Sequence, residues 1–151
     1  MRPGIIAPTD SHLPSANLDL VRSIYAEWER GDFSSAEWAD PEIEFAFAGG
    51  PEPGSWKGLA GMAEGYREWL RAWDGFRAEP EEYLVLDGER ILVLVRNSGR
   101  GRTSGLELEE RSVANLFHLR GGQVTRIVVY LDRGLAFSDL GLAREADSSG
   151  P

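Results

Sequence analysis

Asn115 is the residue of this sequence whose type and position point most directly to chemistry. It alternates with Val113, Phe117 and Leu119, so a β-strand would place its amide in an otherwise apolar row. A buried amide needs hydrogen-bond partners or a ligand, because an unpaired polar group is costly away from water. Two interpretations stay open: Asn115 donates to a ligand carbonyl or oxyanion, or it pairs with a neighbouring backbone group.

Two carboxylates, Glu107 and Glu109, precede Asn115 with the same alternation. In a regular strand they would approach the same pocket, where burial raises the pKa of a carboxyl group and makes it a candidate general base. The opposite interpretation is that this stretch overhangs into solvent and its charges form surface ion pairs. Because Glu110 interrupts the alternation, a β-bulge could exchange the two faces.

Three further polar residues are weaker candidates. His118 has the opposite alternation to Asn115, which predicts the outer side of the sheet. Asp132 follows the last predicted strand, where we expect an ion pair or a helix cap rather than a base. Asn97 ends its strand, and it either lines the mouth of a pocket or begins a turn.

The composition limits the classes of partner. The chain has 151 residues, no cysteine and a net charge of −9, which argues against binding to nucleic-acid phosphates or anionic membranes. No apolar run approaches the roughly 20 residues of a membrane span. The lack of cysteine excludes disulfides and thiolate-bound metals, and the two histidines argue against a histidine-based zinc site. We expect a cytoplasmic protein without metal or organic cofactor.

Periodicity and turn signals predict the elements that position these residues. Apolar residues recur at helical spacing in three segments, alternate in several others, and are separated by glycine, proline and capping patterns. The predicted elements are a flexible arm over 1–14, a helix from Ser15 or Asn17 to Gly31, a short helix over 34–39, a strand over 42–48, a loop over 49–54, a helix over 59–74, strands over 78–87, 90–96, 106–119 and 124–131, a closing helix over 134–142, and a disordered tail over 143–151.

This order predicts a single α+β domain over 15–142, with the helices packed on the concave face of a curved antiparallel sheet. Gly121-Gly122 supplies the turn of its longest hairpin. The resulting cone would bind a small hydrophobic molecule at its mouth, and apolar residues on both faces of the hairpin predict a homodimer. The residues expected to line the pocket are Phe45, Phe47, Trp56, Tyr66, Trp69, Val95, Asn97, Val113, Phe117 and Val129.

Several short pieces of the chain, in this order, resemble the nuclear-transport-factor-2-like superfamily and within it the SnoaL-like group. They are Tyr25–Asp32 (YAEWERGD), Trp38–Pro41 (WADP), Trp56–Gly58 (WKG), Ala114–Gly122 (ANLFHLRGG) and Tyr130–Leu142 (YLDRGLAFSDLGL). The resemblance implies a cone-shaped, cystatin-like α+β barrel that is often dimeric through the outer face of its sheet. Members include ketosteroid isomerases, polyketide cyclases, limonene-epoxide hydrolases, dehydratases and non-catalytic binding domains.

The resemblance carries over few catalytic residues. The aspartate base of the isomerases falls on Ala46, their oxyanion tyrosine falls near Ile24, one residue from Tyr25, and their protonated aspartate falls near Asn115. The Asp–Arg–Asp triad of the epoxide hydrolases falls near Val95, Asn97 and Val129, so it is absent.

Two functions stay open at this stage. The first is acid/base catalysis of the isomerase, cyclase or hydrolase type on a small hydrophobic molecule. In that case Asn115 polarises an oxygen and Glu109 or Glu107 acts as the base. The alternative is a non-catalytic module that binds a small ligand or a second subunit.

Overall fold

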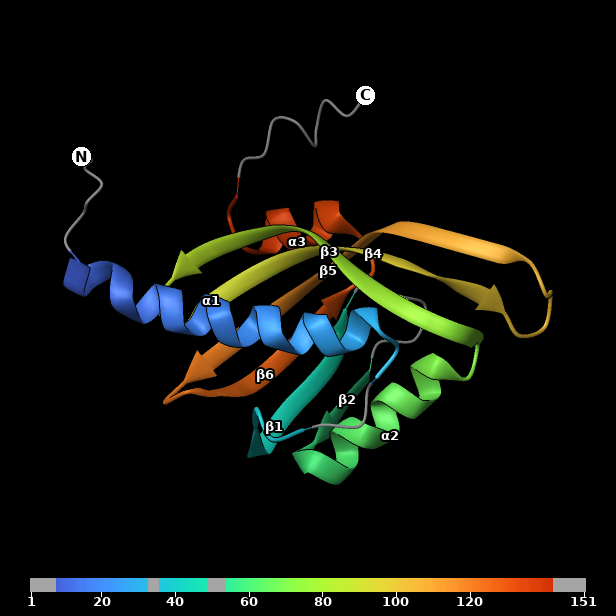
Figure 1. The fold of residues 1–151 in the computed structure, drawn as a ribbon, viewed down its shortest axis with the longest axis horizontal. Coiled ribbons are helices and arrows are strands. Elements are labelled where there is room, and N and C mark those ends of the chain that lie inside the picture. Colours follow the sequence, from blue (N-terminus) through green and yellow to red (C-terminus); the bar gives the residue numbers. More distant parts are fainter. Residues whose placement is uncertain (1–7, 33–35, 49–53, 143–151) are drawn as a thin grey trace.

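The fold is a curved six-stranded sheet with helices on both of its faces (Figure 1). The computed structural model describes residues 8–32, 36–48 and 54–142. Its elements are α1 (Pro8–Glu29), β1 (Ala39–Ala48), β2 (Gly54–Lys57), α2 (Gly58–Leu70), β3 (Trp73–Asp87), β4 (Arg90–Gly101), β5 (Glu107–Arg120), β6 (Gln123–Tyr130) and α3 (Arg133–Asp139).

The strands are ordered β2-β1-β6-β5-β4-β3. The run from β3 to β6 is an antiparallel meander, while β1 pairs in parallel with β6. The β5–β6 turn pairs Arg120 with Gln123, and Gly121 and Gly122 have φ angles of 63° and 81°. These positive values confirm the predicted glycine turn. Helices α1 and α2 cover the concave face and α3 lies on the other face (Figure 1), so the predicted cone-shaped α+β fold is confirmed, with one parallel strand pair added.

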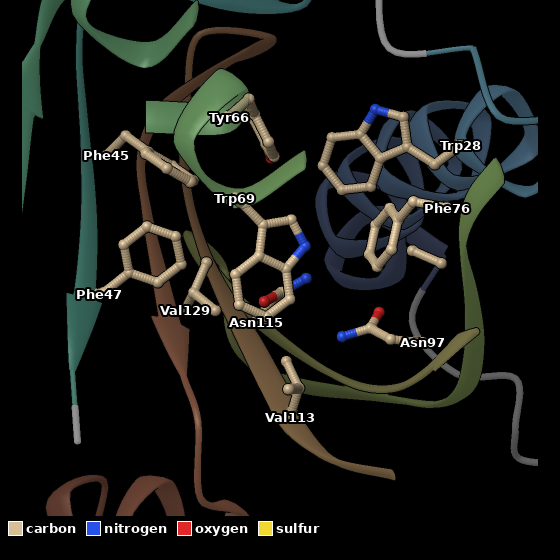
Figure 2. A pocket seen from close by; sticks show the side chains of 11 residues that line it. Trp28, Phe45, Phe47, Tyr66, Trp69, Phe76, Asn97, Val113, Asn115 and Val129 are labelled. Carbon is tan, nitrogen blue, oxygen red and sulfur yellow. The ribbon is translucent and has the colours of Figure 1, made fainter. Parts of the chain in front are cut away.

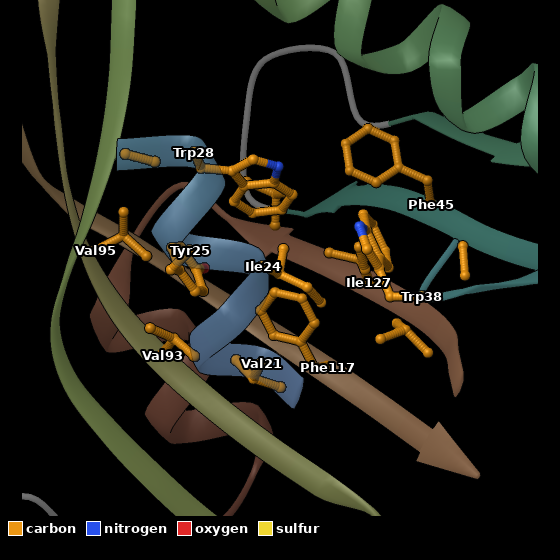
Figure 3. Packing of buried hydrophobic residues seen from close by; sticks show 14 of the residues in the cluster. Val21, Ile24, Tyr25, Trp28, Trp38, Phe45, Val93, Val95, Phe117 and Ile127 are labelled. Carbon is orange, nitrogen blue, oxygen red and sulfur yellow. The ribbon is translucent and has the colours of Figure 1, made fainter. Parts of the chain in front are cut away.

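Helix α1 packs on the sheet through the apolar stripe seen in the sequence. Val21, Ile24, Tyr25 and Trp28 are all at most 3 % exposed, and Figure 3 shows them against the strand residues of the core. The helix begins at Pro8 rather than near Ser15 or Asn17. A proline is tolerated at a first helical position, because the N–H that it lacks would have no partner there.

Asn17, a predicted helix cap, has another use. It lies inside α1, and its Nδ2 donates to the carbonyl oxygen of Gly88 at 2.8 Å, which ties the helix to the β3–β4 turn. The predicted arm over 1–14 therefore overlaps the helix from residue 8 onward. Residues 1–7 and the predicted tail over 143–151 lie outside the described residues.

The short helix predicted over 34–39 is not formed in its described part. Residues 36–38 form a turn in which Ala39 N donates to Ala36 O at 3.1 Å. The end of this segment bonds to the sheet instead: Val124 N of β6 donates to Trp38 O at 2.8 Å, and Ala39 pairs with Val124. Residues 34 and 35 lie outside the described residues.

The segment around α2 departs from prediction at both ends. Residues 54–57 form strand β2, in which Trp56 pairs with Phe45 of β1, instead of a loop that leads into the helix. Helix α2 ends at Leu70 rather than Asp74, because Trp73 already begins β3. Of the loop predicted over 49–54, residues 49–53 lie outside the described residues.

Gly65 sets the distance between α2 and the sheet. A Cβ atom at this position would lie 2.6 Å from Cδ2 of Phe45 and 3.0 Å from Cε3 of Trp56. Both contacts are shorter than ordinary van der Waals distances, so only glycine allows this approach.

Strand β5 contains a β-bulge. Val95 pairs with Val113, but Asn97 pairs with Glu110, so β5 has one residue more than β4 between these pairs. A bulge of this kind shifts the alternation of the strand by one position.

Arg133, the first residue of α3, joins three strands at this irregularity. Its guanidinium donates to the carbonyl oxygens of Val95 at 3.0 Å and Val113 at 3.3 Å, and it forms an ion pair with Glu81 at 2.7 Å. Asp132 caps the helix by accepting from Gly134 N at 2.8 Å, as expected from the sequence.

The outer face of the sheet carries a second apolar cluster, which α3 covers. Ala136 and Phe137 of α3 are buried against strand residues. The strand residues of this cluster are Leu92, Leu94, Ala114, Leu116, Val128 and Tyr130. A helix of the same chain therefore covers part of the face for which the sequence predicted a second subunit, and the homodimer stays a prediction.

We expect Gly65→Ala to lower the free energy of unfolding by about 1–3 kcal/mol, because the added methyl group would displace Phe45 and Trp56. Gly88→Ala is the matched control, since a Cβ atom at Gly88 meets no atom within 4 Å. Urea unfolding of both variants measures the difference. Equal stabilities would contradict the close approach of α2 to β1.

We expect Arg133→Met to lower the free energy of unfolding by about 1–3 kcal/mol, because two strand carbonyls lose their donor. Arg71→Met, which breaks an exposed ion pair with Glu68, should change it by less than about 0.5 kcal/mol. Thermal unfolding of the two variants at one pH tests this contrast. A smaller loss in Arg133→Met than in Arg71→Met would contradict the role of Arg133 at the bulge.

His118 should make stability depend on pH. Burial, then the charges of Arg126 and Arg90, lower the pKa of its imidazole, against weaker opposing effects of Asp87 and Glu44. The unfolded chain therefore binds the proton first as the pH falls below about 6.5, so the folded state loses stability there.

Between pH 7.5 and pH 5.5 we expect His118→Gln to lose less stability than the unchanged protein, by up to about 1.4 kcal/mol per pH unit. The carboxylates titrate in both proteins, so their contribution cancels in the difference. Urea unfolding at the two pH values measures it, and parallel losses would show that His118 is not responsible.

Candidate functional site

A cavity of about 30 Å³ lies on the concave side of the sheet, where α1 and α2 approach it (Figure 2). Seven elements, all those named above except α3 and β2, supply its side chains, and most of these are aromatic or aliphatic. The lining residues are Trp28, Phe45, Phe47, Tyr66, Trp69, Phe76, Ala78, Asn97, Val113, Asn115 and Val129.

The wall of the cavity is a continuous set of rings from α2 and the strands. The ring centroids of Phe45 and Tyr66 are 4.5 Å apart, and the rings of Phe47 and Trp69 are stacked with their centroids 5.7 Å apart. Phe76 meets Trp69 edge-on at 5.9 Å. Such contacts stabilise the packing of α2 against β1 and β3 and give the cavity a flat, apolar surface.

The polar end of the cavity is formed by two buried amides. Asn97 is 3 % exposed and Asn115 is 7 % exposed. Nδ2 of Asn115 donates to the hydroxyl oxygen of Tyr25 at 2.7 Å, while its Oδ1 is buried and accepts from no partner within the described part of the chain.

Tyr25 holds this end of the cavity in place. Its ring meets Trp28 edge-on at 5.0 Å and Phe117 at 5.8 Å. Burial raises the pKa of its hydroxyl far above the ordinary value, and the hydrogen bond from Asn115 opposes this only partly. The hydroxyl is therefore neutral at any physiological pH.

The strand register explains why Asn115 faces the cavity. Asn115 pairs with Val93 of β4 on one side and with Val129 of β6 on the other. Both neighbours are apolar and buried, so the sheet offers the amide no cross-strand side-chain partner. Tyr25, which comes from α1, supplies the partner that the sequence analysis did not identify.

Seven of the ten residues expected to line a pocket do line the cavity, and Asn115 joins them. Phe45 and Phe47 come from β1, Tyr66 and Trp69 from α2, Asn97 from β4, Val113 from β5 and Val129 from β6. Whether they bind a ligand stays a prediction.

The other three expected residues lie elsewhere. Trp56 packs against the ring of Phe45 and lies beside Gly61 and Gly65 of α2. Val95 and Phe117 are fully buried under α1, and Figure 3 shows both beside Tyr25. All three belong to the core around the cavity.

The two expected bases, Glu107 and Glu109, do not reach the cavity. The bulge in β5 reverses their alternation, so Glu109 pairs with Ser98 instead of continuing the row of Asn115. Glu109 forms an ion pair with Arg96 at 3.2 Å, and Glu107 forms one with Arg100 at the same distance. Their side chains are 52 % and 82 % exposed, as in the alternative interpretation of surface ion pairs.

Three lining residues were missed from the sequence. Trp28 was assigned only to the core stripe of the first helix. Phe76 and Ala78 lie on β3, which begins at Trp73, whereas the sequence analysis extended the preceding helix to Asp74. The signal that could have identified them is the alternation of Phe76 and Ala78 with charged neighbours.

The described residues that line the cavity include no Asp, Glu, His, Lys or Arg. Tyr66 is the titratable group among them, and burial raises its pKa well above the ordinary value, so it stays neutral. Ala46, at the position of the isomerase base, pairs with Val128 of the outer apolar cluster. The described lining therefore offers neutral hydrogen-bonding groups and no proton acceptor of ordinary basicity.

The described residues hold neither a metal-binding cluster nor a membrane-spanning helix. Within 8–32, 36–48 and 54–142, no group of three or more His, Asp or Glu side chains could hold a metal ion. None of the helices in the same residues combines the length and the apolar character needed to cross a bilayer.

Comparison with solved structures gives the same fold. TerC, co-crystallised with polyporic acid, is 22 % identical, with a TM-score of 0.66 over 83 % of this chain and 97 % of TerC. A putative SnoaL-like polyketide cyclase from Jannaschia sp. CCS1 is 15 % identical, with a TM-score of 0.66 over 91 % and 97 % of the two chains. A protein of unknown function with a cystatin-like fold from Xanthomonas campestris is 16 % identical, with a TM-score of 0.63 over 84 % and 98 %.

Comparison with curated proteins gives no match. The family model of the SnoaL-like domain matches residues 21–127, which include α1 from Val21, β1 to β5 and both amides. The chain therefore belongs to the SnoaL-like family.

Proposed function

We propose that this protein binds a small, ring-containing apolar molecule in the cavity and performs no acid/base chemistry on it. The observation that carries the proposal is the composition of the described lining residues, which combine an aromatic wall with two neutral buried amides and include no charged group. Ligand sites of this kind use apolar contacts for affinity and a few polar groups for orientation.

The size of the cavity implies that binding opens it. A volume of about 30 Å³ holds about two water molecules, whereas a pocket for a ligand of drug size needs roughly 300–1,000 Å³. Phe47 and Trp69 are only partly buried and stack on each other across the gap between β1 and α2. We propose that these two rings turn outward to admit the ligand.

The comparisons support a small-molecule role in general terms. TerC, which shares the fold, was crystallised with polyporic acid. The putative polyketide cyclase from Jannaschia sp. instead favours catalysis, and so does the bond between Asn115 and Tyr25, since a pair of this kind could polarise a carbonyl group.

The lack of a proton acceptor among the described lining residues favours binding without chemistry. An acid/base enzyme needs a titratable group within hydrogen-bond reach of the reacting atom. Glu107 and Glu109, the candidates from the sequence, point away from the cavity and are neutralised by arginines. Binding without chemistry therefore agrees better with the geometry.

The proposal is tested by titrating the ¹⁵N-labelled protein with para-ethylphenol and following the indole N–H signals by NMR. We expect the signals of Trp28 and Trp69, which line the cavity, to shift with one common dissociation constant. Trp38 is the internal reference, because it does not line the cavity.

Two variants change the free volume of the cavity in opposite directions. Phe47→Ala should tighten binding by about tenfold, because it removes a ring that has to move, and Ala78→Leu should weaken it by about tenfold by filling the cavity. The matched control is Leu106→Ala, which shortens an exposed leucine outside the cavity and should change nothing. Unshifted Trp28 and Trp69 signals in both the unchanged protein and Phe47→Ala would refute the proposal.

A further inference from the structure

We infer that Asn115 determines specificity by accepting a hydrogen bond from the ligand, so that the site selects neutral molecules with a hydroxyl or N–H group. This inference rests on the proposed binding function and adds the polar chemistry of the ligand. It reverses the expectation from the sequence, in which Asn115 donates to a carbonyl group.

One of the two N–H groups of the amide is already engaged. Nδ2 of Asn115 donates to the hydroxyl oxygen of Tyr25 at 2.7 Å. Edge-on contacts with Trp28 and Phe117 hold the Tyr25 ring, and a third contact, with Tyr83, lies at 6.3 Å. With the ring held on three sides, the hydroxyl oxygen has a fixed position and fixes the orientation of the amide.

The acceptor oxygen of the amide has no partner among the described residues, and Asn115 lines the cavity. Asn115 is 93 % buried, and its Oδ1 has no hydrogen-bond partner in the part of the chain that the structure describes. A buried acceptor without a donor costs roughly 1–3 kcal/mol. A ligand that reaches this oxygen avoids that cost only if it brings a donor of its own.

The surroundings of Oδ1 narrow the ligand class further. Val93 and Val129, the cross-strand neighbours of Asn115, are apolar, and no described Lys, Arg or His lines the cavity. An anionic ligand would bring charge to an acceptor oxygen with no cation to balance it. A ketone or a hydrocarbon would leave Oδ1 without a donor. An alcohol, a phenol or a neutral N–H compound satisfies both the oxygen and the aromatic wall.

Asn97 makes a second polar contact possible. It lies on β4 at the same cavity, pairs with Ala78 and is 3 % exposed. Its amide can accept from or donate to another polar atom of the same ligand. We therefore place the hydroxyl or N–H of the ligand toward Asn115 and its ring against the aromatic wall, in the space that Phe47 and Trp69 leave when they turn outward.

The experiment compares three probes of one ring system by the same NMR titration. Para-ethylphenol carries a donor, para-ethyltoluene replaces the hydroxyl with a methyl group, and para-ethylacetophenone carries an acceptor alone. We expect the phenol to bind about tenfold more tightly than either of the others. Asn115→Leu should remove this preference. Gln123→Leu, which also replaces a side-chain amide with leucine but lies at the β5–β6 turn, should keep it.

Tyr25→Phe tests how the orientation of Asn115 is set. The variant keeps the ring and removes the oxygen that holds Nδ2, so the amide can turn and donate. We expect the ketone to gain affinity relative to the hydrocarbon in this variant. If the role of Tyr25 were purely structural, the variant would bind all three probes more weakly by the same factor.

The outcomes separate this inference from the proposed function. If the phenol and the hydrocarbon bind equally well, the binding function stands and the role of Asn115 is refuted. If the ketone binds most tightly to the unchanged protein, Asn115 acts as a donor and the inference is overturned. If none of the probes shifts the Trp28 and Trp69 signals, the inference falls together with the binding function.

Discussion

A single extra residue in β5 determines which side chains reach the cavity, and much of the site depends on it. Beyond this bulge the alternation of the strand is reversed, so Glu107 and Glu109 turn to arginines while Val113 and Asn115 keep facing inward. Arg133 stabilises the irregular geometry by donating to strand carbonyls on both sides of the β4–β5 pair. Backbone register thus sets which glutamate of β5 pairs with Asn97: Glu110 takes the place of Glu109, and neither lines the cavity.

The two ends of the cavity depend on different packing constraints. At the aromatic end, Gly65 lets α2 approach β1 closely enough for its rings to stack on Phe45 and Phe47. At the polar end, Tyr25 from α1 holds Asn115 in one orientation. Neither constraint involves a titratable group that ionises near neutral pH, which is why binding agrees with the geometry better than proton transfer does.

The sequence predicted most of the fold, because the signals involved are local. The Gly121-Gly122 turn, the stripe of α1 and the alternation of β1 depend on residues close together in the chain. The errors lie where long-range pairing overrides a local pattern. Trp38 and Ala39 bond to Val124 of β6 instead of ending a predicted short helix, and Trp73 and Asp74 begin β3 instead of ending a longer one.

The features of the site also divide into those that local sequence patterns predicted and those that only the tertiary structure determined. Strand alternation by itself identified the buried row of Asn115, and helical spacing with alternation identified the rings of Phe45, Phe47, Tyr66 and Trp69. Only the tertiary structure decided which way Glu107 and Glu109 face, because a bulge is a property of two paired strands. It alone also decided that Tyr25 accepts from one N–H of Asn115 while Oδ1 has no partner among the described residues, since Tyr25 and Asn115 are far apart in the chain and meet only when α1 packs on the sheet.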